Sequence, residues 1–173
     1  MQVEINPSEY TVLIVDDTIA NVLLLKVLIG NQKYRIVTAG NGMEALQAVE
    51  KESPDLILLD IMMPGMNGYE VAEKLKADPQ TQEIPIIFLT ALNSTNDIVK
   101  GFKTGASDYI SKPFNKEELL IRVTHQISLI AAKRLIASQM KELQSTIRGR
   151  DRLYSVIAHD LRSPMGSLKM IFN

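Results

Sequence analysis

The sequence predicts an α/β fold, a doubly wound five-stranded parallel sheet followed by a long C-terminal helix. Five short apolar runs are typical of strands, and a segment with helical spacing follows each of them. Strands that are apolar throughout and alternate with helices indicate a parallel sheet that is buried on both faces. We expect the strands near residues 11–16, 34–39, 55–60, 84–90 and 107–111.

The helices that connect these strands are bounded by clear start and stop signals. Gly40-Asn41-Gly42 precedes the second helix, and Asp78-Pro79 ends the third. From Lys116 onward no strand signal follows, so the last helix runs on alone. We expect the helices near 18–31, 42–52, 67–77, 94–104 and from 116 onward.

Composition excludes several classes of protein. The 173 residues carry a formal net charge of −1, which gives no electrostatic indication of nucleic-acid binding. The absence of cysteine excludes disulfides, thiolate catalysis and Cys-ligated zinc. No apolar run reaches the roughly 18 residues of a membrane span, and the N-terminus lacks the pattern of a signal peptide. We therefore expect a cytoplasmic protein with no membrane segment in these residues.

Polar side chains gather where the predicted strands end. Loops beyond the carboxyl ends of the strands form the ligand crevice of a doubly wound sheet. Three carboxylates that converge there would repel by ~4 kcal/mol per close pair at an effective dielectric near 20, so a divalent cation is the natural neutraliser. Oxygen ligands without His or Cys favour Mg²⁺. The residues predicted to meet at this edge are Asp16, Asp17, Asp60, Thr90 and Lys112.

This set of residues suits a phosphoryl group carried on a carboxylate. An Asp can attack phosphorus and form an aspartyl phosphate, while positioning and charge neutralisation supply most of the rate. Asp60 is the predicted nucleophile, because it stands alone at the end of the middle strand. The loop after it contains Gly65 and Gly68, which allow backbone freedom.

Residues 10 to about 130 resemble a response-regulator receiver domain. The matching motifs are VDD at 15–17, LLDIMMPGMNG at 58–68, LTA at 89–91 and GASDYISKPF at 105–114. The resemblance implies the strand order 2-1-3-4-5 and a phosphoacceptor at Asp60. It also implies a Mg²⁺ site built from Asp16, Asp17, Asp60 and the backbone carbonyl of Met62.

Three further roles follow from the same resemblance. Thr90 would move onto the phosphoryl group, Lys112 would be its ion partner, and Tyr109 would change rotamer with Thr90. A cis bond is implied between Lys112 and Pro113. The alternative is a haloacid-dehalogenase-like phosphatase, which would want a D-x-D pattern on the first strand, whereas this chain has Asp16-Asp17-Thr18.

The C-terminal helix carries an apolar seam. Its residues repeat with a mean spacing near 3.5, which is the signature of a coiled coil or bundle helix, and the seam shifts phase near 131–135. It therefore predicts a homodimer, although Arg150 weakens the pattern. The seam consists of Ile136, Met140, Leu143, Ile147, Arg150, Tyr154, Ile157, Leu161, Pro164 and Leu168.

The segment around His159 resembles the H-box of the dimerisation and phosphotransfer domain of sensor histidine kinases. HDLRSP at 159–164 matches the H-[DE]-L-R-[ST]-P hallmark. The resemblance implies that His159 accepts a γ-phosphoryl group and that Asp160 assists as general base. Ser163 stands where the family often has Thr or Asn, and Pro164 would kink the helix. The ATP-binding domain is absent, so ATP would bind only in a missing part of a longer parent.

Together these motifs predict two-component signalling by a receiver-first hybrid histidine kinase. The predicted segments are a tail (1–9), the receiver (10–130), a coiled-coil linker (131–152) and a truncated phosphotransfer helix (153–173). In this hypothesis phosphorylation of Asp60 regulates an attached kinase centre at His159. The alternative is a phosphate sink or docking receiver with a dimerising helix and no control of kinase activity.

The predicted partners follow from the same scheme. A histidine kinase or phosphotransfer protein would be the phosphodonor, and a downstream response regulator would receive the output. The basic residues of the linker lack aromatic partners and a recognition motif, so we expect no nucleic acid. Enzymatic activity would belong to a parent histidine protein kinase and not to these residues by themselves.

Overall fold

The computed structural model describes residues 4–91 and 95–169, with side chains for all of these except 95 and 162–169. The chain divides into two compact units, Met1–Ala131 and Ala132–Asn173. After a short 3-10 helix at Pro7–Glu9, the strands are β1 (Thr11–Val15), β2 (Arg35–Ala39), β3 (Leu56–Asp60), β4 (Ile86–Thr90) and β5 (Asp108–Ser111). The helices are α1 (Ile19–Gly30), α2 (Gly42–Glu52), α3 (Gly68–Ala77), α4 (Thr95–Lys103) and α5 (Lys116–Lys169).

The sheet of the first unit is parallel, with the strand order β2-β1-β3-β4-β5. Neighbouring strands are aligned so that Val15 lies beside Ala39 and Leu59, and Thr90 lies beside Ser111. The predicted fold class and strand order are therefore confirmed. Because the strands run in one direction, the residues after Val15, Leu59, Leu89 and Ile110 meet at one edge of the sheet.

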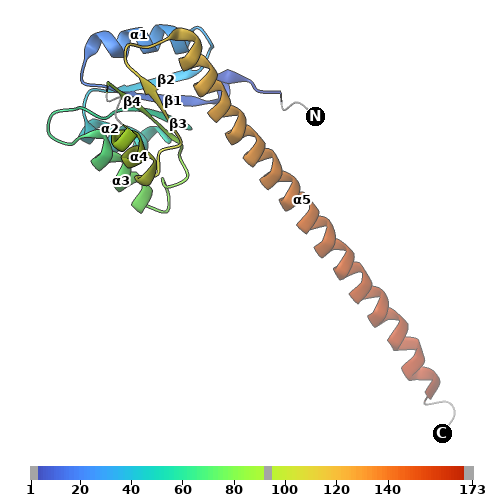
Figure 1. The fold of residues 1–173 in the computed structure, drawn as a ribbon. Coiled ribbons are helices and arrows are strands. Elements are labelled where there is room, and N and C mark those ends of the chain that lie inside the picture. The colour runs from blue at the N-terminus through green and yellow to red at the C-terminus, as the bar shows by residue number, and fades with distance from the viewer. Residues whose placement is uncertain (1–3, 92–94, 170–173) are drawn as a thin grey trace. The chain divides into compact units, whose positions relative to one another are not determined.

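Helices cover both faces of the sheet, and Figure 1 shows α1 and the start of α5 on one side with α2, α3 and α4 on the other. On the first side Leu25 of α1 and Val123 of α5 join a buried cluster with Ile14. On the second side Val49 of α2 and Val71 of α3 pack in a cluster with neighbouring strand residues. Strands β1, β3 and β4 are buried along their whole length. This burial on both faces explains why their sequences are apolar without alternation.

Side-chain caps fix the starts of α2 and α3. Asn41 accepts from the backbone N–H of Glu44. Asn67 and Glu70 form a reciprocal capping box at the start of α3. The capping box fixes the start of α3, directly after the loop that follows β3.

The helix α5 belongs to both units. Its buried face ends at Ala131, and from Lys133 to Leu161 every residue is exposed within the single chain. The coiled coil and the dimer remain predictions, since one chain cannot display them. The helix runs past Pro164 to Lys169, but the side chains of Ser163, Pro164 and Leu168 lie outside the described residues, as do residues 170–173 of the predicted phosphotransfer helix. None of the helices in the described ranges carries an apolar stretch long enough to cross a bilayer.

Candidate functional site

The two carboxylates after β1 lie in different environments. The Asp16 side chain is 0 % exposed, whereas Asp17 is exposed. Asp16 Oδ1 accepts a hydrogen bond from the backbone N–H of Thr18 at 2.8 Å, and Oδ2 accepts from Asn21 Nδ2 at 3.1 Å. Both residues lie at the sheet edge where the sequence predicts them, and of the two only Asp16 is buried. Burial is tolerated because donors satisfy both of its oxygens.

Asp60 ends β3 with its side chain 4 % exposed. Its Oδ1 accepts a hydrogen bond from the backbone N–H of Met62 at 3.3 Å. Gly68, at the start of α3, packs directly against this point, because an added Cβ would fall on the carbonyl oxygen of Asp60 and 2.8 Å from Cα of Ile61. Gly68 is therefore required for close approach and not for the backbone freedom that the sequence suggested. Gly65 does adopt a left-handed conformation, with φ of 75°.

Lys112 joins the two buried carboxylates. Its Nζ lies 2.9 Å from Asp16 Oδ2 and 3.1 Å from Asp60 Oδ1. Its backbone N–H donates to the carbonyl oxygen of Thr90 at 2.8 Å, which ties the end of β4 to the same place. The Lys112–Pro113 bond is cis, as predicted. The ammonium thus neutralises part of the charge that the two carboxylates bring together.

The surroundings shift the protonation of this pair. Burial raises the pKa of the Asp60 carboxyl, and the charge of Asp16 adds to the rise, while Lys112 acts against it. Burial also acts to lower the pKa of Lys112 and is the largest single influence. The hydrogen bonds and charges of Asp16 and Asp60 together outweigh it, so the pKa of Lys112 is raised. Lys112 is therefore a fixed cation beside a carboxyl whose pKa is raised.

The three carboxylates are placed to hold a metal ion. One oxygen from each of Asp16, Asp17 and Asp60 lies within 4.8 Å of the others. Oxygen donors alone fit a hard cation such as Mg²⁺, which binds through one or two carboxylates and keeps several waters. The site therefore fits the ion that the sequence predicts, with Asp17 contributing the exposed carboxylate. Met62 lies two residues after Asp60, and its backbone would supply the predicted carbonyl ligand.

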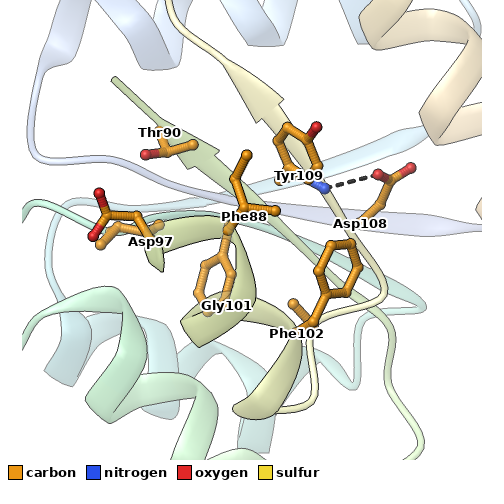
Figure 2. A pocket seen from close by; sticks show the side chains of 10 residues that line it. Phe88, Thr90, Asp97, Gly101, Phe102, Asp108 and Tyr109 are labelled. Atoms are coloured by element: carbon orange, nitrogen blue, oxygen red, sulfur yellow. Dashed lines mark hydrogen bonds between the residues drawn. The ribbon is translucent and has the colours of Figure 1, made fainter. Parts of the chain in front are cut away.

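Thr90 and Tyr109 border a hollow behind the acidic pocket. Figure 2 shows Thr90 on β4, Tyr109 on β5 and Phe102 on α4 around it, and its volume is about 270 Å³, part of which is open to solvent. The Tyr109 ring packs edge-on against Phe102, with centroids 6.1 Å apart. The guanidinium of Arg122 lies 5.5 Å from the same ring. Thr90 is therefore the residue that the pocket and the hollow share, and Tyr109 lies in the hollow.

Several of these neighbours were not predicted from the sequence. Arg122 also pairs with Asp108 at 2.7 Å and with Glu118 at 3.0 Å. The spacing of four between Glu118 and Arg122 on a helix is a signal that could have found one of these pairs. The contact of Asn21 with Asp16 had a weaker signal, an Asn in the first turn of a mostly apolar helix.

His159 lies in the second unit and is described by itself. Its side chain is 86 % exposed, and Nδ1 lies 3.6 Å from Asp160 Oδ1. The sequence predicts this exposure, because His159 lies on the opposite side of the helix from the seam. The His–Asp pair is thus accessible, and its chemical role remains a prediction.

Comparison with known proteins identifies the first unit. Residues 12–124 match the family described as the response regulator receiver domain. The chain belongs to this family. Its receiver is 45% identical over 112 residues to the response regulator PleD of Caulobacter vibrioides, covering 65% of this chain and 25% of PleD. It is 43% identical over 112 residues to the DNA-binding response regulator MtrA of Mycobacterium tuberculosis, covering 65% of this chain and 48% of MtrA. The chain thus spans a quarter to about half of the length of these relatives.

Solved structures show the same receiver fold. A putative response regulator from Chloroflexus aurantiacus superimposes with a TM-score of 0.66 at 35% identity, over 69% of this chain and 98% of that one. The receiver domain of a signal transduction histidine kinase from Syntrophus aciditrophicus gives a TM-score of 0.65 at 34% identity, over 69% and 90% of the two chains. The receiver family acts in two-component signalling, takes its phosphoryl group from kinases and uses an acidic pocket for Mg²⁺, which here is the cluster of Asp16, Asp17 and Asp60. The matched residues end before the H-box segment, which the family assignment does not include.

Proposed function

We propose that the receiver accepts a phosphoryl group on Asp60 and that this modification regulates a histidine kinase centre at His159 of the same protein. The observation that carries the first part is the Lys112 ammonium held between the Asp16 and Asp60 carboxylates, at 2.9 and 3.1 Å. This places a fixed positive charge beside the carboxylate that would carry the phosphoryl group. Positioning and charge neutralisation are the main sources of catalysis in phosphoryl transfer.

The two carboxylate oxygens of Asp60 have different roles in this proposal. Oδ1 is engaged by Lys112 and by the backbone N–H of Met62, so Oδ2 is assigned as the attacking atom. A bond forms between Oδ2 and phosphorus while the bond from phosphorus to the donor's nitrogen or oxygen breaks, and the donor leaves with that electron pair. Bound Mg²⁺, held by Asp16, Asp17, Asp60 and the carbonyl of Met62, would neutralise charge on the phosphoryl oxygens.

The switch residues of the proposal border the hollow behind the pocket. Thr90 would turn its hydroxyl toward the phosphoryl group, and Tyr109 would follow into the space that this movement changes. Tyr109 contacts Arg122, and Arg122 is paired with Glu118 on α5. A change of Tyr109 rotamer would therefore alter the contacts of Arg122 in the first turns of α5.

The second part of the proposal rests on the exposed pair in the other unit. His159 is accessible for attack on a γ-phosphoryl group, and Asp160 lies 3.6 Å from its Nδ1. The exposed seam would join two copies of the helix, and the ATP-binding partner domain would be supplied by a longer protein. The scheme places the protein in the cytoplasm, with a kinase or phosphotransfer protein upstream and a response regulator downstream.

The phosphoacceptor assignment is tested by reacting the chain with Mg²⁺ and a small-molecule acyl phosphate, followed by intact-mass measurement. We expect one phosphoryl group that hydroxylamine removes, and none in Asp60→Asn. Asp151→Asn, at an exposed position of the second unit, is the matched control and should be modified like the wild type. Undiminished labelling of Asp60→Asn would overturn the assignment.

Regulation is tested in a protein that carries this chain together with a kinase ATP-binding domain. We expect Asp60→Ala and a one-residue insertion between Ala132 and Lys133 each to change autophosphorylation at His159. Passage of phosphate from His159 to Asp60 without any change in autophosphorylation would instead identify a phosphate sink. His159→Gln should abolish phosphorylation that is stable to alkali and labile to acid, whereas an acyl phosphate on Asp60 is labile to both.

A further inference from the structure

Asn21 makes a contact that the proposed mechanism leaves without a role. It is the third residue of α1, and its Nδ2 donates to Asp16 Oδ2 at 3.1 Å. In the first turn of a helix, Asn side chains commonly hydrogen-bond local backbone groups. Here the side chain is instead directed to a buried carboxylate five positions back. The contact therefore links the start of α1 to Asp16.

Asn21 and Lys112 share one acceptor. Both donate to Asp16 Oδ2, at 3.1 and 2.9 Å, while the other oxygen is occupied by the backbone N–H of Thr18. Lys112 also lies 3.1 Å from Asp60, the proposed phosphoacceptor. A dianionic phosphoryl group on Asp60 would attract the ammonium away from Asp16. Asn21 would then be the side chain that still holds Oδ2.

The neutrality of the donor matters at this position. A cationic side chain would orient Asp16 equally well but would cancel the charge that attracts a metal ion, and a carboxylate would repel it. An amide holds the oxygen and leaves the negative charge in place. Groups that hydrogen-bond metal-ligating carboxylates typically change metal affinity by about 10- to 100-fold when they are removed.

We propose that Asn21 is a positioning residue of the metal site, which holds Asp16 in its ligating orientation independently of Lys112. The inference rests on the proposed function, because it presumes that Mg²⁺ binds beside Asp16 and that Asp60 is phosphorylated. It adds a residue on α1 to a site otherwise built from strand ends. The role is to orient a ligand, with no contact to the phosphoryl group.

The test is a calorimetric titration of the full chain with Mg²⁺. Asn21→Leu keeps the number and branching of the side-chain heavy atoms and removes the donor, and we expect its dissociation constant for Mg²⁺ to rise about tenfold. Asn31→Leu, at the exposed C-cap of the same helix, should bind Mg²⁺ like the wild type. Leu is the better helix former, so a role limited to the helix predicts an unchanged affinity and an equal or higher melting temperature without metal.

A second measurement uses the wild-type chain and needs no variant. In NMR spectra the side-chain amide of Asn21 should exchange slowly with solvent and should shift when Mg²⁺ is added, while that of Asn31 should do neither. With Mg²⁺ and beryllium trifluoride as a phosphoryl mimic, the slow exchange of Asn21 should persist. Fast exchange of the Asn21 amide under these conditions would overturn the proposal.

The Mg²⁺ affinities of the wild type and of Asn21→Leu distinguish a failure of this inference from a failure of the proposed function. Equal Mg²⁺ affinity in Asn21→Leu and the wild type would overturn the role of Asn21 and leave the receiver chemistry intact. Failure of the wild type to bind Mg²⁺ at millimolar concentration would overturn both. A loss of affinity confined to Asn21→Leu would support the proposal.

Discussion

The two units of this chain differ in how far their apolar and charged side chains are buried. In the receiver, Asp16 and Asp60 are buried and share one ammonium, and the strand residues around them are inaccessible. In the second unit Leu143 is 61% exposed, and Arg150 pairs with its exposed neighbour Asp151. The buried carboxylates of the receiver have partners within the receiver, whereas the part of α5 in the second unit exposes its apolar seam. Substitutions should therefore act on folding in one unit and on association in the other.

The largest expected effect contrasts two glycines. Gly68→Ala places a methyl group against the Asp60 carbonyl, and we expect it to destabilise the receiver by about 3 kcal/mol or more, the upper end of overpacking costs, because the neighbouring atoms are backbone. At Gly149 on α5 an added Cβ would meet open space. Gly149→Ala should therefore stabilise the helix by about 1 kcal/mol and leave the free energy of unfolding of the receiver unchanged. Urea denaturation followed by circular dichroism measures both. Equal changes in the free energy of unfolding for the two variants would contradict this difference between the units.

The seam provides the second test. Leu143→Asp puts a charge where two apolar stripes would meet, and we expect dimer affinity to fall by roughly 100-fold, or about 2.7 kcal/mol. The receiver's melting temperature should not move, because Leu143 is exposed in the single chain. Sedimentation equilibrium of the wild type and the variant measures the change. Gln144→Asp, off the seam, is the control, and a wild type that stays monomeric at high micromolar concentration would contradict the predicted dimer.

The pH dependence of stability tests the buried pair with a smaller effect. Because the pKa of Asp60 is raised in the folded state, its contribution to stability is fully present below the ordinary value of 3.8 and is lost as pH rises through the folded value. Without metal, Asp60→Asn should therefore be more stable than the wild type at pH 7, and the difference should shrink as pH falls toward 3.8. Thermal melts of both proteins between pH 3.8 and pH 7 measure this difference in stability. A difference that grows on acidification would show the opposite sign of shift.

The smallest effect compares two arginines. Arg122 is partly exposed and pairs with both Asp108 and Glu118, so Arg122→Met should cost about 0.5–1 kcal/mol after allowance for solvent screening. Arg150→Met removes an exposed pair with an adjacent residue and should have no measurable effect on stability. Denaturant midpoints for the two variants give the comparison. A larger loss at Arg150 would reverse it.

Strands β1, β3 and β4 could be predicted because each is a continuous apolar run that both faces of the sheet bury. The strand order came from the resemblance to receivers, since periodicity alone cannot order parallel strands. The meeting of Asp16, Asp60 and Lys112 followed from their places at strand ends, but which oxygens share the ammonium depends on side-chain rotamers that the sequence does not display. Gly68 was misinterpreted for the same reason, because close approach to Asp60 is a tertiary contact.

The ammonium between the two buried carboxylates also sets the valence of the ion that the pocket can accept. Three carboxylates and one ammonium leave two negative charges, which a single divalent ion cancels. A monovalent ion would leave the pocket anionic, and a trivalent ion would reverse its sign and oppose Lys112. Lys112→Met should accordingly shift preference toward trivalent ions such as the lanthanides. In this way Lys112 would influence which metal ion the pocket prefers without being a ligand itself.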